Sequence, residues 1–220
     1  MKDYTPQIQR IKKKLHQANR TDSNFTVFGA GSHKYEINAP ICGYEVEVFE
    51  KHYQIQLPEC YKSFITHIGN GGKSYLNSGA GPFFGIYPFG AYLDDLIHGK
   101  VEQHLKKECI LHPNICEIQW DKMIEPLYGD SITDTAYEAL NGTLYGGILP
   151  IGSQGCSFIH ALVLNGRHKG KIVNLDRGEL SPPKFSEDSN FLDWYERWLD
   201  EIITEKLITI SPSWFGYPKN

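Results

Sequence analysis

The sequence predicts a single domain that contains both helices and strands. Two patterns support this class. Apolar side chains repeat at helical spacing near both ends of the chain, and two short β-rich segments lie between residues 158 and 176. The chain has 220 residues, of which 40% are apolar, so it can bury one sizeable core. We therefore expect a mixed domain that is organised around the strand pair.

The strand pair lies in the stretch 148–176 and contains its densest turn signals. The run from Phe158 to Leu164 is largely apolar on both alternating faces, as expected for an interior strand covered on both sides. Asn165-Gly166 and a second glycine supply the positive-φ positions that a hairpin reversal needs. The chain then returns over 171–176 as a second strand, and a short strand with a bend precedes the hairpin.

Helices are predicted on both sides of this hairpin. The apolar spacing indicates a first amphipathic helix over about 6–18, whose basic run is interpreted as a solvated face. Further helical patterns begin after Pro40, at Leu57-Pro58, at Thr133 with a stop at Asn141-Gly142, and at Asn190 for the last helix. Short strands are expected at Phe25 to Val27 and at Phe83 to Phe89, the second of them paired in the central sheet, whereas 93–128 is ambiguous.

Composition restricts the function. The formal net charge is −4, so no global positive field exists to hold nucleic acid or an anionic membrane. No apolar run approaches the ~20 residues that span a bilayer, and the start lacks the apolar core of a signal peptide. The five cysteines are scattered without the spacing of a disulfide framework. We therefore expect a cytoplasmic protein with reduced thiols, no cofactor and no direct contact with nucleic acid or membrane.

Several ordered blocks resemble a known family. They lie within about 36–203 and comprise Phe49, Tyr53, Leu57, Pro58, Tyr61, Phe64 and the segment 69–72, followed by LYGGILPIGSQGC, ALVLNG, GKIVNLD and FLDWYERWLDEI. In order and spacing the set resembles the SUKH superfamily of Smi/Knr-type proteins, in its bacterial immunity-protein branch. The resemblance implies an α+β fold in one domain, with a curved mixed sheet flanked by helices. It also implies a protein-binding role without a catalytic centre, because bacterial members typically bind and neutralise a toxin, often a nuclease.

The resemblance also sets the expected domain organisation. Residues 1–25 are an N-terminal amphipathic helix and lead-in, 26–205 form the SUKH-like domain, and 206–220 are an aromatic C-terminal tail. The tail is expected to pack on its own domain or on a partner.

Candidate chemical sites in the sequence are weak. His104, Cys109, His112 and Cys116 have donor types that zinc prefers, but their spacing straddles Pro113 and matches no usual zinc site. Cys156 and His160 would lie about 13 Å apart along a strand, too far for a nucleophile and its base. We predict no metal site and no catalytic residues.

The last helix carries the best candidate for a partner surface. Residues 187–205 contain seven acidic side chains and one basic side chain, which gives a local net charge of −6. Such a face could attract a basic partner, with a tryptophan at the edge of the apolar stripe as its anchor. The alternative is an ordinary solvated helix face. The predicted partner-binding residues are Asp193, Trp194, Glu196, Arg197, Asp200 and Glu201.

Three functions follow from these patterns. The first is an immunity protein that binds and neutralises a cognate toxin, and the second is a regulatory or scaffold protein of the same fold with another protein partner. The third is an enzyme with a composite site from Asp94, Asp95, His98 and His104. This function requires the four side chains to come together in space, which the sequence does not indicate.

Overall fold

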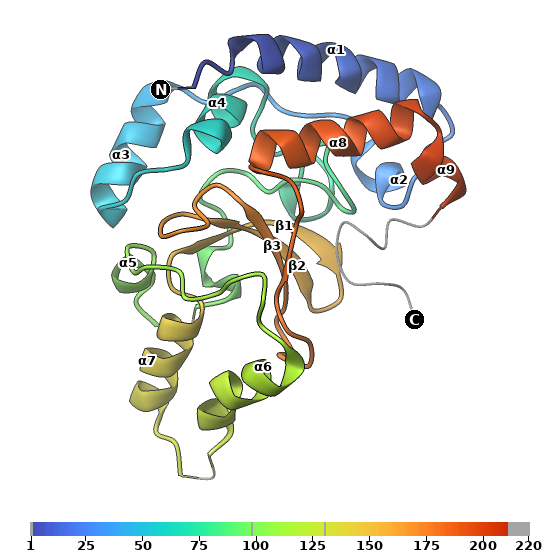
Figure 1. Ribbon diagram of the computed structural model, residues 1–220. Coiled ribbons are helices and arrows are strands. Elements are labelled where there is room, and N and C mark those ends of the chain that lie inside the picture. Colours follow the sequence, from blue (N-terminus) through green and yellow to red (C-terminus); the bar gives the residue numbers. More distant parts are fainter. Residues whose placement is uncertain (1, 98, 130, 211–220) are drawn as a thin grey trace.

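The computed structural model describes residues 2–97, 99–129 and 131–210 and has an α+β fold (Figure 1). The elements in chain order are α1 (Thr5–Thr21), α2 (Ala30–His33), α3 (Gly43–Tyr53), α4 (Glu59–His67), the short 3-10 helices η1 (Tyr75–Asn77) and η2 (Leu93–Asp95), α5 (Val101–His104), α6 (Glu117–Ile124), the 3-10 helix η3 (Glu125–Tyr128), α7 (Asp134–Leu144), β1 (Ile148–Gly155), β2 (Phe158–Val163), β3 (Ile172–Asp176), β4 (Lys184–Phe185), α8 (Phe191–Ile203) and α9 (Lys206–Thr209). The predicted α+β single-domain class is confirmed.

The sheet has the strand order β1-β2-β3-β4, and each described pair is antiparallel. Leu162 pairs with Leu149 on one side and with Ile172 on the other, so the predicted central hairpin is present. The resemblance implied a mixed sheet. The described strands differ from this because neighbours in sequence are also neighbours in space, which is the arrangement that hairpin connections produce.

Both faces of the sheet are covered by helices (Figure 1). Leu162 and Ile172 point into a core shared with α1, α4 and α8. Val163 and Val173, one residue further along each strand, point into a second core shared with α6 and α7. Because successive side chains of a strand point to opposite faces, each strand contributes to two separate cores. This explains why both faces of the hairpin are apolar in sequence.

The two other predicted strands are not formed. In the segment 83–89, only Ile86 makes isolated bridges, to Gly79 and Gly152. Phe83 and Gly85 have φ values of 54° and 96°, which an extended strand does not tolerate. Near residue 25 the buried carboxylate of Asp22 accepts hydrogen bonds from the N–H groups of Thr26 (2.6 Å) and Val27 (3.1 Å), and this contact folds the segment into a turn.

Helix α7 also differs from the prediction, because it runs through the expected stop at Asn141-Gly142. The imidazole of His104 packs directly against Gly142, and a Cβ atom there would lie 2.1 Å from His104 Cε1. Gly142 is therefore required by close packing and does not end the helix.

The predicted tail falls mostly on residues 211–220, which lie outside the described residues. In the part of the chain that the structure describes, no helix has the length and apolar content needed to cross a membrane.

We predict that Leu162→Asp is severely destabilising and that Arg167→Ala is mild. Leu162 is completely buried, whereas Arg167 lies on the exposed hairpin connection. Burial of an unpaired carboxylate costs several kcal/mol, and exposed substitutions usually change the free energy of unfolding by ~0.5 kcal/mol or less. Urea denaturation of both variants measures the difference, and equal losses would contradict the placement of the hairpin.

Candidate functional site

Helix α8 forms because its sequence provides a cap and a continuous apolar stripe. The Asn190 side chain accepts hydrogen bonds from the N–H groups of Leu192 (2.9 Å) and Asp193 (3.3 Å), which caps the first turn as predicted. Tyr195 and Leu199 on the apolar stripe are fully buried against the sheet and α4. The helix is therefore fixed along its whole length over one face of the sheet (Figure 1).

The tryptophans of α8 do not form a surface anchor. Trp194 is 0% exposed and Trp198 is 1% exposed. Trp194 packs against the ring of His160 on the sheet, and Trp198 stacks on Tyr35 with the ring centroids 5.9 Å apart. The expectation that one tryptophan lies at the edge of the apolar stripe is wrong, because α8 has packing partners on more than one side.

The acidic side of α8 is covered by α1. Arg10 Nε lies 3.0 Å from Glu196 Oε1, and Lys14 Nζ lies 2.9 Å from the same oxygen and 2.6 Å from Asp200 Oδ1. Gln7 Nε2 donates hydrogen bonds of 2.9 Å to both Asp193 and Glu196. Lys14 therefore belongs to a helix–helix contact and not to the solvated face that the sequence suggested.

The remaining charged residues of the predicted surface are also engaged. Arg197 pairs with Asp188 at 2.6 Å, and Glu201 pairs with Lys206 at 2.7 Å. Asp200 keeps half of its side chain exposed, whereas Glu196 is buried. Arg10 and Lys14 of α1 therefore compensate two of the six net negative charges counted along the sequence, and the neighbouring Lys206 compensates a third. Arg197 is already included in that count.

The contact also changes the acidity of Glu196. Burial by itself would raise the pKa of this carboxyl, but hydrogen bonds from Arg10, Lys14 and Gln7 outweigh burial and hold the pKa below its ordinary value. The charged form of Glu196 therefore stabilises the packing of α1 on α8.

We predict that Glu196→Gln destabilises the fold at pH 7 and that the difference from wild type shrinks in acid. A carboxyl whose pKa is lower in the folded chain contributes stability above its unfolded pKa, near 4.5, and loses that contribution as the pH falls through the folded pKa. Urea denaturation between pH 7 and pH 3 checks this expectation. Glu187→Gln, at an exposed acidic residue nearby, is the matched control, and a pH-independent difference for Glu196→Gln would contradict the ion-pair role.

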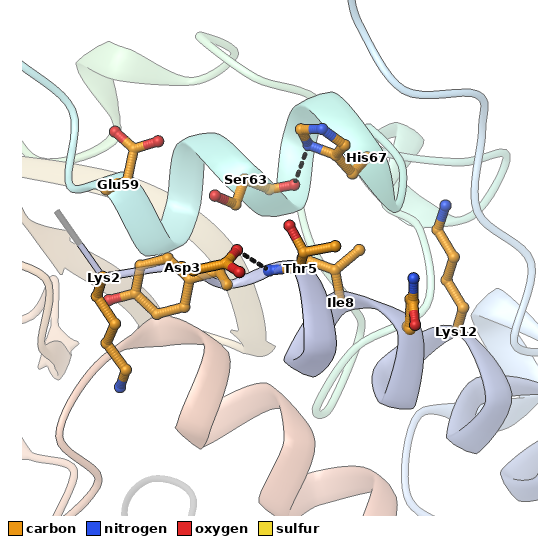
Figure 2. Close-up of a pocket in the computed structure, with 10 residues that line it drawn as sticks. Lys2, Asp3, Thr5, Ile8, Lys12, Glu59, Ser63 and His67 are labelled. Carbon is orange, nitrogen blue, oxygen red and sulfur yellow. Dashed lines mark hydrogen bonds between the residues drawn. The ribbon is translucent and has the colours of Figure 1, made fainter.

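A groove lies between α1 and α4 and has a volume of about 530 Å³ (Figure 2). Tyr4 and Ile8 supply its apolar floor. Lys2 and Glu59 lie toward one end, and Lys12 lies toward the other. Asp3 accepts a hydrogen bond of 2.9 Å from the N–H of Thr5, the first residue of α1. Charges of both signs around this groove do not select one class of ligand.

The other predicted groupings are not brought together. Cys156 is exposed at the β1–β2 turn while His160 is completely buried, so they do not form a nucleophile and base. His104 is buried against α7, whereas Cys116 is exposed at the start of α6. Within the described ranges, no group of three or more His, Cys, Asp or Glu side chains could hold a metal ion.

The residues of the composite enzyme hypothesis have other partners. Asp95 lies 3.4 Å from the guanidinium of Arg177 and accepts a hydrogen bond of 3.4 Å from the hydroxyl of Tyr87. His98 lies outside the described residues. All five cysteines are free thiols.

A buried polar cluster crosses the sheet beneath α8. His160 Nδ1 donates to Asn174 Oδ1 at 2.7 Å, and Gln154 Nε2 donates to the same oxygen at 2.9 Å. The amide of Asn174 donates to the carbonyl of Lys184 at 3.0 Å, so the cluster links all four strands. Burial lowers the pKa of His160 to about 4. His160 is therefore neutral and shielded from solvent, and its hydrogen bond to Asn174 stabilises the sheet.

We predict that His160 makes the fold less stable as the pH falls from about 6.5 to about 4, because the unfolded chain takes up a proton there and the folded chain does not. His33, whose pKa burial also lowers to about 4, adds to the same loss. His160→Gln should therefore flatten the slope of unfolding free energy against pH in this window without abolishing it. An unchanged slope, measured by urea denaturation, would contradict the assignment.

Reasoning from the sequence missed the largest exposed apolar side chains. Leu180 is 89% exposed on the connection between β3 and β4, and Tyr128 is 61% exposed on η3. Tyr44 on α3 and Ile118 on α6 are similarly exposed. One signal in the sequence could have indicated Leu180, since it is a single apolar residue in a polar turn that ends at Pro182-Pro183.

The chain was compared with known proteins. The model of the SMI1 / KNR4 family (SUKH-1) matches residues 44–197. This segment begins within α3 and ends within α8, so it contains the whole sheet and excludes α1. No curated protein and no solved structure matches the chain.

Proposed function

Because the chain belongs to the SMI1 / KNR4 family (SUKH-1), we propose that this protein acts by binding another protein and is not an enzyme. The family match over 44–197 is the observation that carries this proposal. The large apolar side chains Leu180, Tyr44, Ile118 and Tyr128 are exposed on separate elements, and side chains of this kind are available for contact with a protein partner.

The proposed partner is a cognate toxin domain, and the proposed role is immunity in the cytoplasm. This finer proposal rests on the resemblance to the bacterial branch, whose members bind and neutralise toxins that are often nucleases. A nuclease must attract a polyanion and therefore presents basic side chains. A net charge of −4 favours encounter with such a surface.

Neutralisation by occlusion requires a stable complex. Specific interfaces bury about 1,200–2,000 Å² in total, and a few desolvated side chains at the centre carry most of the affinity. Binding over a toxin's active site would exclude its substrate without any chemical step by this chain.

The six residues predicted on α8 differ in how far a partner could reach them. Trp194 and Glu196 are buried, and Arg197 and Glu201 are engaged in ion pairs. Asp200, with half of its side chain exposed, is the member that a partner could reach most easily. A contact on this side of the molecule would therefore involve α1 as well as α8.

The alternative is a regulatory or scaffold protein of the same fold with a different protein partner. It shares the protein-binding role and differs in the identity of the partner.

We predict that the purified chain binds the toxin domain encoded beside its gene and inhibits that toxin in stoichiometric amounts. Isothermal titration calorimetry measures binding, and an activity assay of the toxin with increasing amounts of this chain measures inhibition. A toxin domain of the same class from an unrelated locus is the control for specificity. Inhibition of both toxins alike would argue against cognate immunity, and absence of binding to the neighbouring toxin would favour the regulatory alternative.

A further inference from the structure

Leu180 stands out among the exposed side chains. It is 89% exposed, the highest value among the large apolar side chains that the structure describes. It lies on the β3–β4 connection, whose far end adjoins α6 (Figure 1). A single exposed leucine is ordinary on a protein surface. Whether Leu180 belongs to a binding surface therefore depends on how the backbone beside it is held.

The preceding residue, Glu179, is held on several sides. Its carbonyl oxygen accepts a hydrogen bond of 2.9 Å from the indole N–H of Trp120, and its own N–H donates to the carbonyl of Asp176 at 3.0 Å. Its carboxylate accepts from the hydroxyls of Tyr128 at 2.8 Å and Tyr145 at 3.4 Å. Although it is a glutamate, Glu179 is only 7% exposed. These contacts fix the base of the connection on α6 and η3.

The backbone at Glu179 has a φ of +60°, in the left-handed region that non-glycine residues rarely adopt. Ten other non-glycine residues in the described part of the chain share this sign of φ, so the hydrogen bonds of Glu179 distinguish this position. Such a conformation persists only where the surroundings impose it, and it is enriched at functional sites. Here the surroundings bury the acidic residue and leave the apolar residue in solvent. A relaxed turn would favour the opposite arrangement.

An aromatic side chain adjoins the same point. Tyr128 donates its hydroxyl to Glu179, while 61% of the residue stays exposed. Leu180 and Tyr128 are therefore both attached to one buried glutamate, from two segments that are far apart in sequence. The hydrogen bonds to Glu179 hold the backbone before Leu180 and the hydroxyl of Tyr128, so less conformational entropy is lost at these points when a partner binds. Tyrosine is among the residues enriched at interface anchors.

The exposed charges of α6 and η3, the elements that contact Glu179, are mainly acidic. Helix α6 and η3 carry the exposed acidic residues Glu117, Asp121 and Glu125 against Lys122, which gives three minus one, a net charge of −2. Arg177 on the same connection pairs with Asp95 at 3.4 Å and donates to the carbonyl of Cys156 at 3.0 Å. Among the described residues, no basic side chain forms an ion pair with Glu179. A basic partner is favoured on this surface.

We propose that Leu180 and Tyr128, held by Glu179, form the anchor of the partner interface and insert into an apolar pocket with a basic rim on the toxin domain. This inference rests on the proposed function and deepens it by naming the surface and the chemistry of the partner. We call this surface the Leu180 loop, defined as residues 177–183 together with Tyr128.

The test compares binding of the neighbouring toxin domain by variants at three places. Leu180→Ala and Leu180→Asp change the Leu180 loop. Val48→Asp changes another exposed aliphatic residue, on α3, and is the matched control. Asp200→Lys changes the exposed part of the α8 surface. Biolayer interferometry at low and high salt gives association and dissociation rates, and thermal unfolding checks that each variant is folded.

We expect Leu180→Ala to raise the dissociation constant by about tenfold or more, mainly through faster dissociation, as truncation of an interface anchor does. Leu180→Asp should weaken it further. Val48→Asp and Asp200→Lys should change it by about twofold or less, within the range of a neutral substitution. The melting temperature of Leu180→Ala should match that of wild type, because the side chain lies in solvent.

Three results would count against this proposal. Wild-type affinity in both Leu180 variants would overturn the Leu180 loop alone and leave the proposed function standing. Weakened binding confined to Val48→Asp or Asp200→Lys would move the interface to α3 or to the α8 surface. Failure of the unmutated chain to bind the neighbouring toxin would overturn the proposed function and, with it, the partner proposed for the Leu180 loop.

Discussion

The arrangement of one half of the molecule depends on the burial of α8 on two sides. Its apolar stripe needs the sheet, where Trp194 packs against His160, and its acidic side needs the cations and the amide of α1. A helix whose apolar side packs on the sheet and whose acidic side pairs with another helix is a central layer of the fold. Little of α8 then remains available to a partner, and the accessible surface is supplied by other elements.

The same contact makes α1 an integral part of the domain. Ile11 and Ala18 of α1 are completely buried in the core that contains α8 and one face of the sheet. The family match begins at residue 44 and does not include this helix. The packing of α1 is therefore a feature that the family model does not describe, yet Glu196 and Asp200 within or next to the matched segment take their counter-charges from it.

The opposite face of the sheet has a different character. Its core contains Trp120 and Tyr145, and both also donate hydrogen bonds to the buried Glu179, which precedes the exposed Leu180. Buried hydrogen bonds that link a core to a loop restrict the motion of the loop backbone and leave its outer side chains exposed to solvent. This combination of a fixed backbone and exposed apolar groups is absent from the groove between α1 and α4, where charged side chains of both signs surround an apolar floor.

The sequence by itself determined the elements whose signals are local. Helical spacing identified α1, α4 and α8, and Asn190 identified the cap of α8. A β-rich run that is apolar on both faces, followed by Asn165-Gly166, identified the β2–β3 hairpin. The tertiary structure decided the features that depend on distant neighbours. Gly142 lies inside α7 with His104 packed against it, and part of the acidity of α8 is compensated because Arg10 and Lys14 approach across about 180 residues of chain. Charge along a sequence adds up locally, but electrostatic energy depends on separation in space. The exposure of Leu180 is likewise a property of the packed chain, since it follows from contacts that bury Glu179 beside it.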